Sequence, residues 1–330
     1  MNRRRWIAAT LSTLAACCLS AGAAAQADYP AKAITLVVGY PPGGSTDLAA
    51  RIIAPELSKR LGQPVVIENT GGAGGAIAAQ KVAKAAPDGY TLMVGANNEM
   101  AIAKLVNPAL KYDGQRDFTP IGLIATQPMV LVAAAHTKVR TLDDFVKYVK
   151  AAPGKYSYGS SGIGTGLHLA GEMVKESGGL YMVHIPYRGV GPLTNDLIGG
   201  QLDFGVFVLS SGLPHVRSGA VAALAVTEPR RATAAPDIPT FAEHPSFRKV
   251  SIGIWFGLFA PAKLPPPVSA KLVQAYQAVI ASPEVRRKLE EAGARPAAAE
   301  GKSDELLATY LKVEQDKYAR IVDFAKIRSE

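Results

Sequence analysis

Two segments of this chain join a β-rich run to a helical run through glycines and short hydroxyl residues. The first, at 34–47, turns through Gly43 and Gly44, and the second, at 156–168, turns through four glycines that begin at Gly159. The first N–H groups of a helix have no acceptor within the helix, and the helix dipole is positive at that end, so such junctions bind anions. Two of them in different halves of one chain predict a small anionic ligand held between two lobes.

Hydroxyl and amide side chains add hydrogen-bond donors near both junctions. Short hydroxyl residues open the first helix and line the second loop, and an asparagine follows the strand-like run at 90–94. In an open α/β sheet, ligands sit beyond the carboxyl ends of the strands, so these groups are expected to face one cleft. The candidates are Ser45, Thr46, Asn97, Ser160, Ser161 and Thr165.

A histidine, His168, lies at the start of the second helix, and two interpretations of it stay open. It is a packing or capping residue, or it is a base that activates Ser160 or Ser161 in an exported serine hydrolase. A nucleophile elbow needs the spacing Gly-x-Ser-x-Gly, which the run from Gly159 to Gly162 lacks. We therefore expect a binding protein and no enzyme, with the hydrolase as the alternative.

The sequence predicts neither a cofactor nor a metal. The glycines at 43–44 are not followed by the Lys-Ser or Lys-Thr pair of a nucleotide P-loop, and those at 71–75 lack the spacing of a dinucleotide fingerprint. No group of His, Asp and Glu has the spacing of metal ligands.

The first 27 residues predict a signal peptide. Arginines at 3–5 form a basic start, an apolar run follows at 6–19, and small residues at 25–27 fit a cleavage site. We therefore expect an exported, periplasmic protein that begins at residue 28. Anchoring by a lipid on Cys17 is the alternative.

Loss of this segment changes the chemistry of the chain. Both cysteines, Cys17 and Cys18, lie in it, so the mature chain has no thiol for a disulfide, a nucleophile or a zinc site. The formal charge of +9 falls to +6, because the segment holds three arginines and no acidic residue. The remaining Lys and Arg are scattered, whereas nucleic-acid binding needs a concentrated basic stripe. We therefore expect no nucleic-acid partner.

The rest of the chain alternates strand-like and helix-like runs, which is typical of an α/β protein with largely parallel sheets. About 300 residues are enough for two lobes with separate cores. The strand-like runs are 34–38, 65–67, 90–94, 129–133, 204–208 and 221–226, and the helix-like runs are 48–61, 76–85, 142–151, 167–175, 192–198 and 304–326.

Two runs, at 121–128 and 251–259, have the composition of crossings between lobes. They predict a discontinuous lobe 1, made of 28–126 and 251–330, and an inserted lobe 2, made of 127–250. The two crossings would form a hinge.

Several ordered motifs resemble the Bug-type receptors, which are the extracytoplasmic solute-binding proteins of tripartite tricarboxylate transporters. In lobe 1 they are 38–47 (VGYPPGGSTD), 61–69, 72–75 and 86–92, and in lobe 2 they are 158–168, 186–189, 199–203, 214–215 and 224–227. The resemblance implies a type II periplasmic-binding (Venus-flytrap) fold, a small organic carboxylate as ligand, and membrane transporter subunits as partners. We expect the receptor to be a monomer.

The resemblance also implies a binding site. Two loops, 40–46 and 160–165, would grip the ligand carboxylate from opposite lobes, and loops near Asn97 and at 187–189 would complete the pocket. The residues carried over are Tyr40, Pro42, Gly43, Gly44, Ser45, Thr46, Asn97, Ser160, Ser161, Gly164, Thr165, His168, Tyr187, Gly189 and Phe207.

One position departs from the family pattern. Where the family commonly carries Asp-Asn after the Phe, this chain has Phe207 and Val208. Loss of that carboxylate removes a partner for a ligand amine, and an aromatic ring could stack on a ring of the ligand. We therefore expect a carboxylate with an apolar or aromatic body in preference to an amino acid. The alternative is that Phe207 points into the core and the ligand is an ordinary dicarboxylate.

The predicted function is capture of a small organic carboxylate between two lobes, for delivery to a membrane transporter. A periplasmic sensor that hands its closed form to a signalling partner stays open as an alternative, because transport and sensing use the same closure.

Overall fold

The computed structural model describes residues 29–298 and 303–327. Within them, helices and strands alternate along the chain, as the sequence predicts for an α/β protein. The predicted signal peptide at 1–27 and the alternative lipid site at Cys17 lie outside the described residues.

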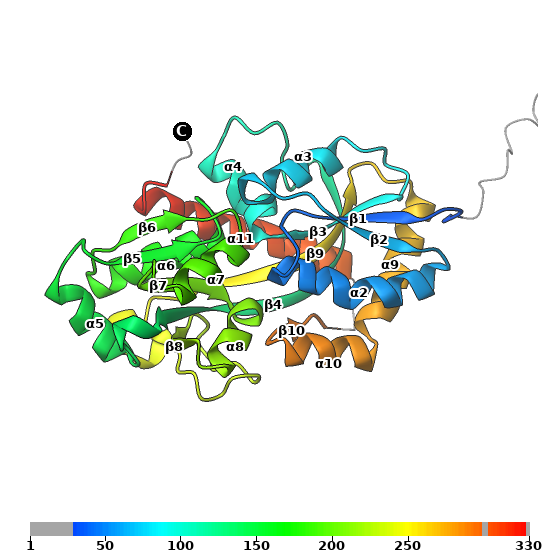
Figure 1. Cartoon of the computed structure of the whole chain (residues 1–330). Coiled ribbons are helices and arrows are strands. Elements are labelled where there is room, and N and C mark those ends of the chain that lie inside the picture. The colour runs from blue at the N-terminus through cyan, green and yellow to red at the C-terminus, as the bar shows by residue number, and fades with distance from the viewer. Residues whose placement is uncertain (1–28, 299–302, 328–330) are drawn as a thin grey trace, which may run out of the picture.

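One group of strands forms a mixed sheet in the order β2-β1-β3-β9-β4, with β10 also paired to β4 (Figure 1). β1 is parallel to β2 and β3, whereas β9 is antiparallel to β3 and β4. We call the part of the molecule built on this sheet lobe 1. The strands are β1 (Ile34–Val38), β2 (Val65–Asn69), β3 (Thr91–Ala96), β4 (Phe118–Ala134), β9 (Gly253–Pro261) and β10 (Arg295–Pro296).

A second group continues from the far half of β4 in the order β4-β7-β5-β6, with β8 also paired to β4. β5 is parallel to β6 and β7, and both β7 and β8 are antiparallel to β4. We call the part built on these strands lobe 2. The strands are β5 (Ser157–Ser160), β6 (Val183–Pro186), β7 (Phe204–Val208) and β8 (Val221–Val226).

Helices cover the sheets of both lobes (Figure 1). In lobe 1 they are α2 (Ser45–Leu61), α3 (Ala76–Ala83), α4 (Ala103–Val106), α9 (Pro266–Ile280) and α10 (Pro283–Glu291); in lobe 2 they are α5 (Leu142–Ala151), α6 (Gly166–Gly178), α7 (Val190–Ile198) and α8 (Leu209–Arg217). Short turns of 3₁₀-helix lie at Ala73–Gly75, Ala135–Thr137, Phe241–Glu243 and Pro245–Phe247, and a π-helical turn lies at Asn98–Ile102.

Local sequence explains where such helices begin and which face they bury. In α5 the hydroxyl of Thr141 accepts a hydrogen bond from the Asp144 N–H, which caps the first turn. Leu142, Phe145 and Val149 recur at helical spacing and are the buried residues of this helix.

Three elements pass between the lobes. β4 is 17 residues long; it pairs with β9 as far as Pro128 and with β7 from Met129 onward. The chain returns to lobe 1 through β9. The C-terminal helix α11 (Ser303–Phe324) packs on β4 and ends beside lobe 2, where Phe324 lines a shallow groove with Tyr181. The predicted division of the chain places all of α11 in lobe 1, although its last turn contacts lobe 2.

The core of lobe 2 lies on both faces of its sheet. All five residues of β7 are buried. Phe204, Val206 and Val208 belong to the large apolar cluster that extends into lobe 1, whereas Phe207 belongs to a smaller cluster with Val130 on the opposite face. The sequence of a strand that is covered on both faces is a continuous apolar run, and 204–208 has this pattern.

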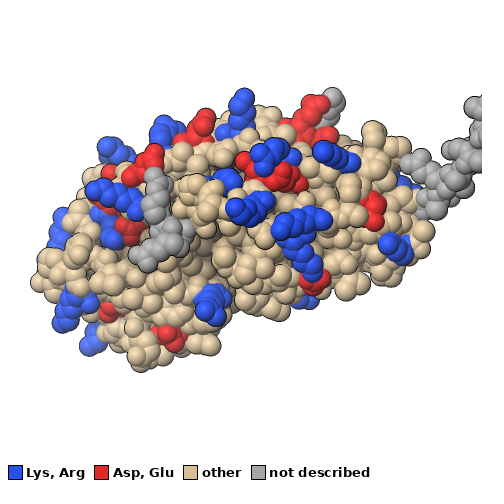
Figure 2. Space-filling model, turned by 90° about the horizontal axis from the view of Figure 1, so that it is seen from above, with Lys and Arg blue, Asp and Glu red and all other residues tan. Residues whose placement is uncertain are grey.

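Charges of both signs are mixed on the upper face of the molecule. Lys and Arg side chains are interspersed with Asp and Glu over both lobes in this view (Figure 2). This face therefore gives no support to a nucleic-acid partner, which would need a stripe of one sign.

Candidate functional site

Two adjoining cavities lie between the lobes. The outer cavity has a volume of about 710 Å³ and the inner cavity about 50 Å³. Residues of both lobes line both cavities, so a ligand here would contact the two halves of the molecule at once. The residues shared by the two cavities are Tyr40, Pro41, Asn98, Ser161 and Gly189.

The inner cavity lies between the starts of two helices from opposite lobes. Gly44 and Ser45 at the start of α2 line it from lobe 1, and Gly189 and Val190 at the start of α7 line it from lobe 2. Within the described part of the chain, no side chain caps either helix start. Two sets of N–H groups without helical acceptors, and two positive dipole ends, therefore converge on a space that fits a carboxylate group.

Two hydroxyl groups add to the donors of α2. Ser45 is 9% exposed and Thr46 is 3% exposed, and both line the inner cavity. Neither hydroxyl has a hydrogen-bond partner among the residues described. Both hydroxyls are therefore free to donate to a ligand in the inner cavity.

The loop before α2 is held by a buried carboxylate. Asp47 is 2% exposed and accepts hydrogen bonds from the Gly43 N–H at 3.0 Å, from Arg51 at 2.8 Å and from Asn69 at 2.9 Å. Burial alone would raise the pKa of Asp47, but these hydrogen bonds together lower it, so the group is ionised. Asn69 also donates to the Tyr40 carbonyl oxygen at 2.9 Å. The Gly43–Gly44 turn is thereby fixed before any ligand arrives.

The loop 160–166 of lobe 2 differs, because most of its donors are already used. The Gly162 N–H donates to the Ser160 hydroxyl, the Gly164 N–H to Nδ1 of His168, and the Gly166 N–H to Oδ1 of Asn98. Thr165 caps α6 by accepting from the His168 N–H. At the start of α6, which the sequence predicts as an anion site, the Gly166 and His168 N–H groups are therefore already paired with protein groups.

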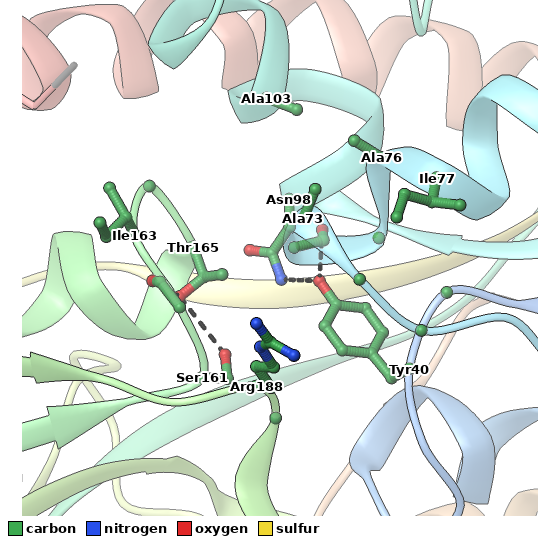
Figure 3. Close-up of a pocket in the computed structure, with 18 of the residues that line it drawn as sticks. Tyr40, Ala73, Ala76, Ile77, Asn98, Ala103, Ser161, Ile163, Thr165 and Arg188 are labelled. Atoms are coloured by element: carbon green, nitrogen blue, oxygen red, sulfur yellow. Dashed lines mark hydrogen bonds between the residues drawn. The ribbon is translucent and has the colours of Figure 1, made fainter. Parts of the chain in front are cut away.

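Asn98 joins the two lobes beside the cavities. Its Nδ2 donates to the Tyr40 hydroxyl in lobe 1, and its Oδ1 accepts from the Gly166 N–H of lobe 2 at 2.6 Å. The Tyr40 hydroxyl in turn donates to the Gly74 carbonyl oxygen at 2.8 Å (Figure 3). Asn98 is 4% exposed, so this bridge lies away from bulk water.

A buried acid, Glu99, lies behind Tyr40. Its Oε1 accepts from the Ala96 N–H at 2.7 Å, and its Oε2 lies 3.4 Å from the Tyr40 hydroxyl. Burial raises the pKa of Glu99 to about 8, so the carboxyl group is mostly protonated at neutral pH. The side of the site nearest this residue therefore carries little negative charge that would repel an anion.

Two stacked histidines lie behind the lobe 2 loop. The rings of His168 and His184 are 3.8 Å apart, and His184 Nε2 lies 2.7 Å from the Ser160 hydroxyl. Burial lowers the pKa of His168 to about 4 and that of His184 to about 3, so both are neutral. Ser160 is fully buried and is paired with His184, not with His168. The Ser161 hydroxyl donates to the Thr165 hydroxyl at 3.3 Å, so neither serine of the hydrolase alternative is hydrogen-bonded to His168.

The predicted site residues fall into two groups. Those that line a cavity are Tyr40, Pro42, Gly44, Ser45, Thr46, Ser161, Gly164, Thr165, Tyr187 and Gly189. Those that line neither cavity are Gly43, Asn97, Ser160, His168 and Phe207. Gly43, Ser160 and His168 hold the two loops in shape, as described above.

Asn97 and Phe207 contact other parts of the fold and not the cavities. Nδ2 of Asn97 donates to the hydroxyl of Tyr318 in α11 at 2.9 Å. Phe207 is 2% exposed and packs with Val130 in the smaller core cluster, which is the arrangement stated as the alternative to a ring in the pocket. Its neighbour Val208 lines the inner cavity instead.

Several lining residues were not among those predicted. Residues 71–75, whose glycines lack the spacing of a dinucleotide fingerprint, form one wall of the outer cavity. Asn98, next to the predicted Asn97, and Arg188, next to the predicted Gly189, also line the outer cavity. A usable signal existed for the start of α7, because Gly189-Val190-Gly191-Pro192 places glycines before a proline that is compatible with a first helical turn.

The described part of the chain contains neither a candidate metal site nor a candidate membrane-spanning helix. Within 29–298 and 303–327, no group of three or more His, Cys, Asp or Glu residues is placed to hold a metal ion. In the same ranges, no helix combines the length and the apolar character needed to cross a membrane.

A ligand-sized cavity between two α/β lobes, lined by helix starts from both, defines a two-lobed solute-binding protein. The chain belongs to the tripartite tricarboxylate transporter family receptors, whose family model matches residues 49–324. It is 34% identical to the protein BugT of Bordetella pertussis over 299 residues, which cover 90% of each chain. The predicted Bug-type membership and the two-lobed fold are thereby confirmed.

Solved structures agree with this assignment. An R. palustris protein with adipate matches with a TM-score of 0.87 and 32% identity, over 91% of this chain and 99% of that one. MatC from Rhodopseudomonas palustris with bound malate matches with a TM-score of 0.83 and 33% identity, over 89% of this chain and 100% of that one. The family consists of transporter receptors, and the structural neighbours, among them the periplasmic binding protein BugD, are binding proteins and not enzymes.

Proposed function

We propose that this receptor binds a small organic carboxylate between its lobes and delivers it to a membrane transporter. The observation that carries the proposal is the inner cavity, where the uncapped starts of α2 and α7 meet from opposite lobes. The free hydroxyls of Ser45 and Thr46 would supply further donors to the carboxylate oxygens.

The placement of the two helix starts explains how binding would close the molecule. Ligand binding shifts an open–closed equilibrium only through contacts that differ between the two states. A carboxylate in the inner cavity reaches α2 and α7 together only when the lobes are close. The closed form would then be the form that the transporter recognises.

The lining of the cavities favours an organic acid over an amino acid. No Asp or Glu is among the described residues that line either cavity, so a ligand ammonium group would find no carboxylate partner. Most side chains around the outer cavity are apolar, among them Ala76, Ile77 and Val106. An apolar or aromatic ligand body therefore fits this space, although the ring of Phe207 does not line it.

The wider setting of the protein follows from the family. Adipate and malate in the two structural neighbours are both dicarboxylates, which supports a carboxylate here. We propose that residues 1–27 are removed on export to the periplasm, that the mature receptor is a monomer, and that its partners are transporter subunits in the membrane. Lipid anchoring at Cys17 is the alternative to a free periplasmic protein.

A thermal-shift screen of the mature protein tests the proposed ligand class. The panel holds succinate, malate, citrate, adipate, benzoate and terephthalate, with aspartate and glutamate as amino acids. A ligand of the native state at a hundred times its Kd stabilises the fold by about 2.7 kcal/mol, which raises Tm measurably. We expect hits among the organic acids, confirmed by calorimetry. Binding of an amino acid alone would contradict the proposal, as would a complete lack of response to carboxylates.

A further inference from the structure

The outer cavity contains one charged side chain that the inner site does not use. Arg188 is the only charged residue among the described residues that line it. Its guanidinium has no hydrogen bond or ion pair with any residue in the described ranges. By contrast, Arg51 is paired with Asp47 and Arg231 with Glu243. Arg188 is therefore a free cation in the wall of a binding cavity.

The position of Arg188 relates it to the carboxylate site. It directly precedes Gly189, which is the N-cap residue of α7 and lines both cavities. In Figure 3 its side chain lies between Ser161 and Tyr40, two residues that also line both cavities. A planar guanidinium binds a carboxylate through two parallel hydrogen bonds, which gives direction as well as charge.

The remainder of the outer cavity is apolar and open at its rim. Ile77 of lobe 1 and Ile163 of lobe 2 lie on opposite sides of the cavity, and each is 53% exposed (Figure 3). Small and aliphatic side chains continue the lobe 1 wall between them: Ala73, Ala76, Ala103, Val106 and Leu110. A ligand body that covers these groups would remove apolar surface from water.

We propose that Arg188 is a specificity-determining residue of this receptor, which pairs with the second carboxylate of a diacid and so sets the preference for diacids over monoacids of the same length. This inference rests on the proposed function, because the first carboxylate occupies the inner cavity. The body runs past Asn98 into the outer cavity and lies against the aliphatic wall. A volume of about 710 Å³ leaves room for such a ligand, because sites for compact organic molecules span roughly 300–1,000 Å³.

Calorimetry with acids matched in carbon number tests the role of Arg188. Adipate and hexanoate share six carbons and one carboxylate, and they differ in the second. We expect the wild-type protein to bind adipate at least about tenfold more tightly, as one charge-assisted hydrogen-bonded pair predicts. Arg188→Gln should weaken adipate binding by about tenfold to a hundredfold and hexanoate binding by less than about threefold.

Two further variants separate charge from geometry. Arg248→Gln makes the same charge change at an exposed arginine of lobe 2 that lines neither cavity, and it should leave both affinities unchanged. Arg188→Lys keeps the charge but loses the planar fork, so it should restore only part of the preference for adipate. Arg188 is exposed, so all of these variants are expected to fold, which their Tm values check.

The affinities of a series of diacids of increasing length test the contribution of the apolar wall. Each added methylene that is buried should tighten binding by about fourfold until the cavity is filled. Ile163→Ser should flatten this increase for the long diacids and leave succinate binding unchanged. The series also reports the length that spans the inner cavity and Arg188.

Three results would overturn the inference. An equal loss of adipate and hexanoate binding in Arg188→Gln would show that Arg188 holds the carboxylate common to both. Unchanged affinities in that variant would show that Arg188 is only a solvated side chain. If the wild-type protein binds no carboxylate at all, the proposed function fails as well, and this result is distinct from the other two.

Discussion

The chemistry beneath the binding loop of lobe 1 depends on a residue that never touches the cavity. Glu99 is 1% exposed and supports Tyr40, which lines both cavities. A buried carboxyl group without a cationic partner stays protonated because burial disfavours its charged form. Proton loss here would place a negative charge behind the hydroxyl that faces the ligand.

This residue predicts a loss of stability in mild alkali. The pKa of Glu99 rises from 4.5 to about 8 on folding, so the folded state holds a proton that the unfolded state has lost. The stabilisation is complete below pH 4.5 and disappears as the pH rises through about 8. We expect Tm to fall between pH 6.5 and 9 in the wild-type protein, and to fall less in Glu99→Gln.

The design of this experiment isolates Glu99 from the histidines. The pKa values of His168 and His184 are lowered from 6.5 to about 4 and about 3, so their contribution changes mainly below pH 6.5, and what remains in the chosen window is common to wild type and Glu99→Gln. The exposed Glu176→Gln variant is the matched control and should follow the wild-type slope. Equal slopes for Glu99→Gln and wild type would contradict the prediction.

Sequence identified several site residues but could not orient all of them. Ser45 and Thr46 follow from the glycine turn and its helix, because local chain geometry is enough to place them. Phe207 and Val208 show the limit. Alternation along a strand tells which residues share a face, but all of β7 is buried, so no polar face marks which side meets the ligand.

At the scale of helices, the proposed carboxylate site uses the starts of α2 and α7, whereas the sequence predicts those of α2 and α6. The sequences before α6 and α7 are both rich in glycine, and local pattern alone favours the one with more hydroxyls. The start of α6 is used by Asn98, which lies 68 residues earlier in the chain. Tertiary contacts therefore decide whether a helix start is free for a ligand, and local sequence propensity cannot predict those contacts.

A charge placed at the start of α7 should imitate the ligand. Gly191 is the second residue of α7, and a Cβ added there meets nothing within 4 Å. Gly191→Asp would place a carboxylate beside the helix N-terminus, where it interacts favourably with the dipole by about 0.3–1 kcal/mol. We expect the free protein to keep or raise its Tm, and its affinity for carboxylates to fall by at least about tenfold, since a like charge then lies in the inner cavity.

The control for this variant keeps the backbone change and omits the charge. Gly191→Ala adds a methyl group at the same open position and should retain carboxylate binding within about threefold, because the helix N–H groups stay free. Calorimetry on both variants gives the comparison. If Gly191→Asp binds carboxylates as tightly as Gly191→Ala, the start of α7 is not the anion site.

At the scale of the whole molecule, the lobes are joined by more than a two-stranded hinge. The sequence predicts crossings at 121–128 and 251–259, because short apolar runs there separate the two sets of motifs. It does not predict that α11 reaches lobe 2, because the sequence of an amphipathic helix shows which face is apolar but not which surface that face packs on. Tyr318 of α11 accepts a hydrogen bond from Asn97. The helix therefore also contacts the residue that precedes Asn98, which bridges the lobes.

The bridge made by Asn98 predicts how open the free receptor is. Asn98→Ala removes the hydrogen bond to Gly166 of lobe 2 and leaves that N–H without its partner. A neutral hydrogen bond contributes about 1 kcal/mol, so the ratio of closed to open molecules should fall by about fivefold. Fluorescence transfer between one dye on each lobe would report a longer mean distance in the free variant. Saturating ligand should restore the closed distance.

The same variant should bind its ligand more weakly, because part of the binding energy is spent on closing lobes that are open more often. Asn107→Ala is the matched control, since Asn107 lines the outer cavity but bonds only locally, to the Ala109 N–H. We expect this control to keep the wild-type distance distribution in the free state. If Asn98→Ala also keeps it, and its affinity is unchanged, the bridge does not hold the lobes together and closure depends on the ligand alone.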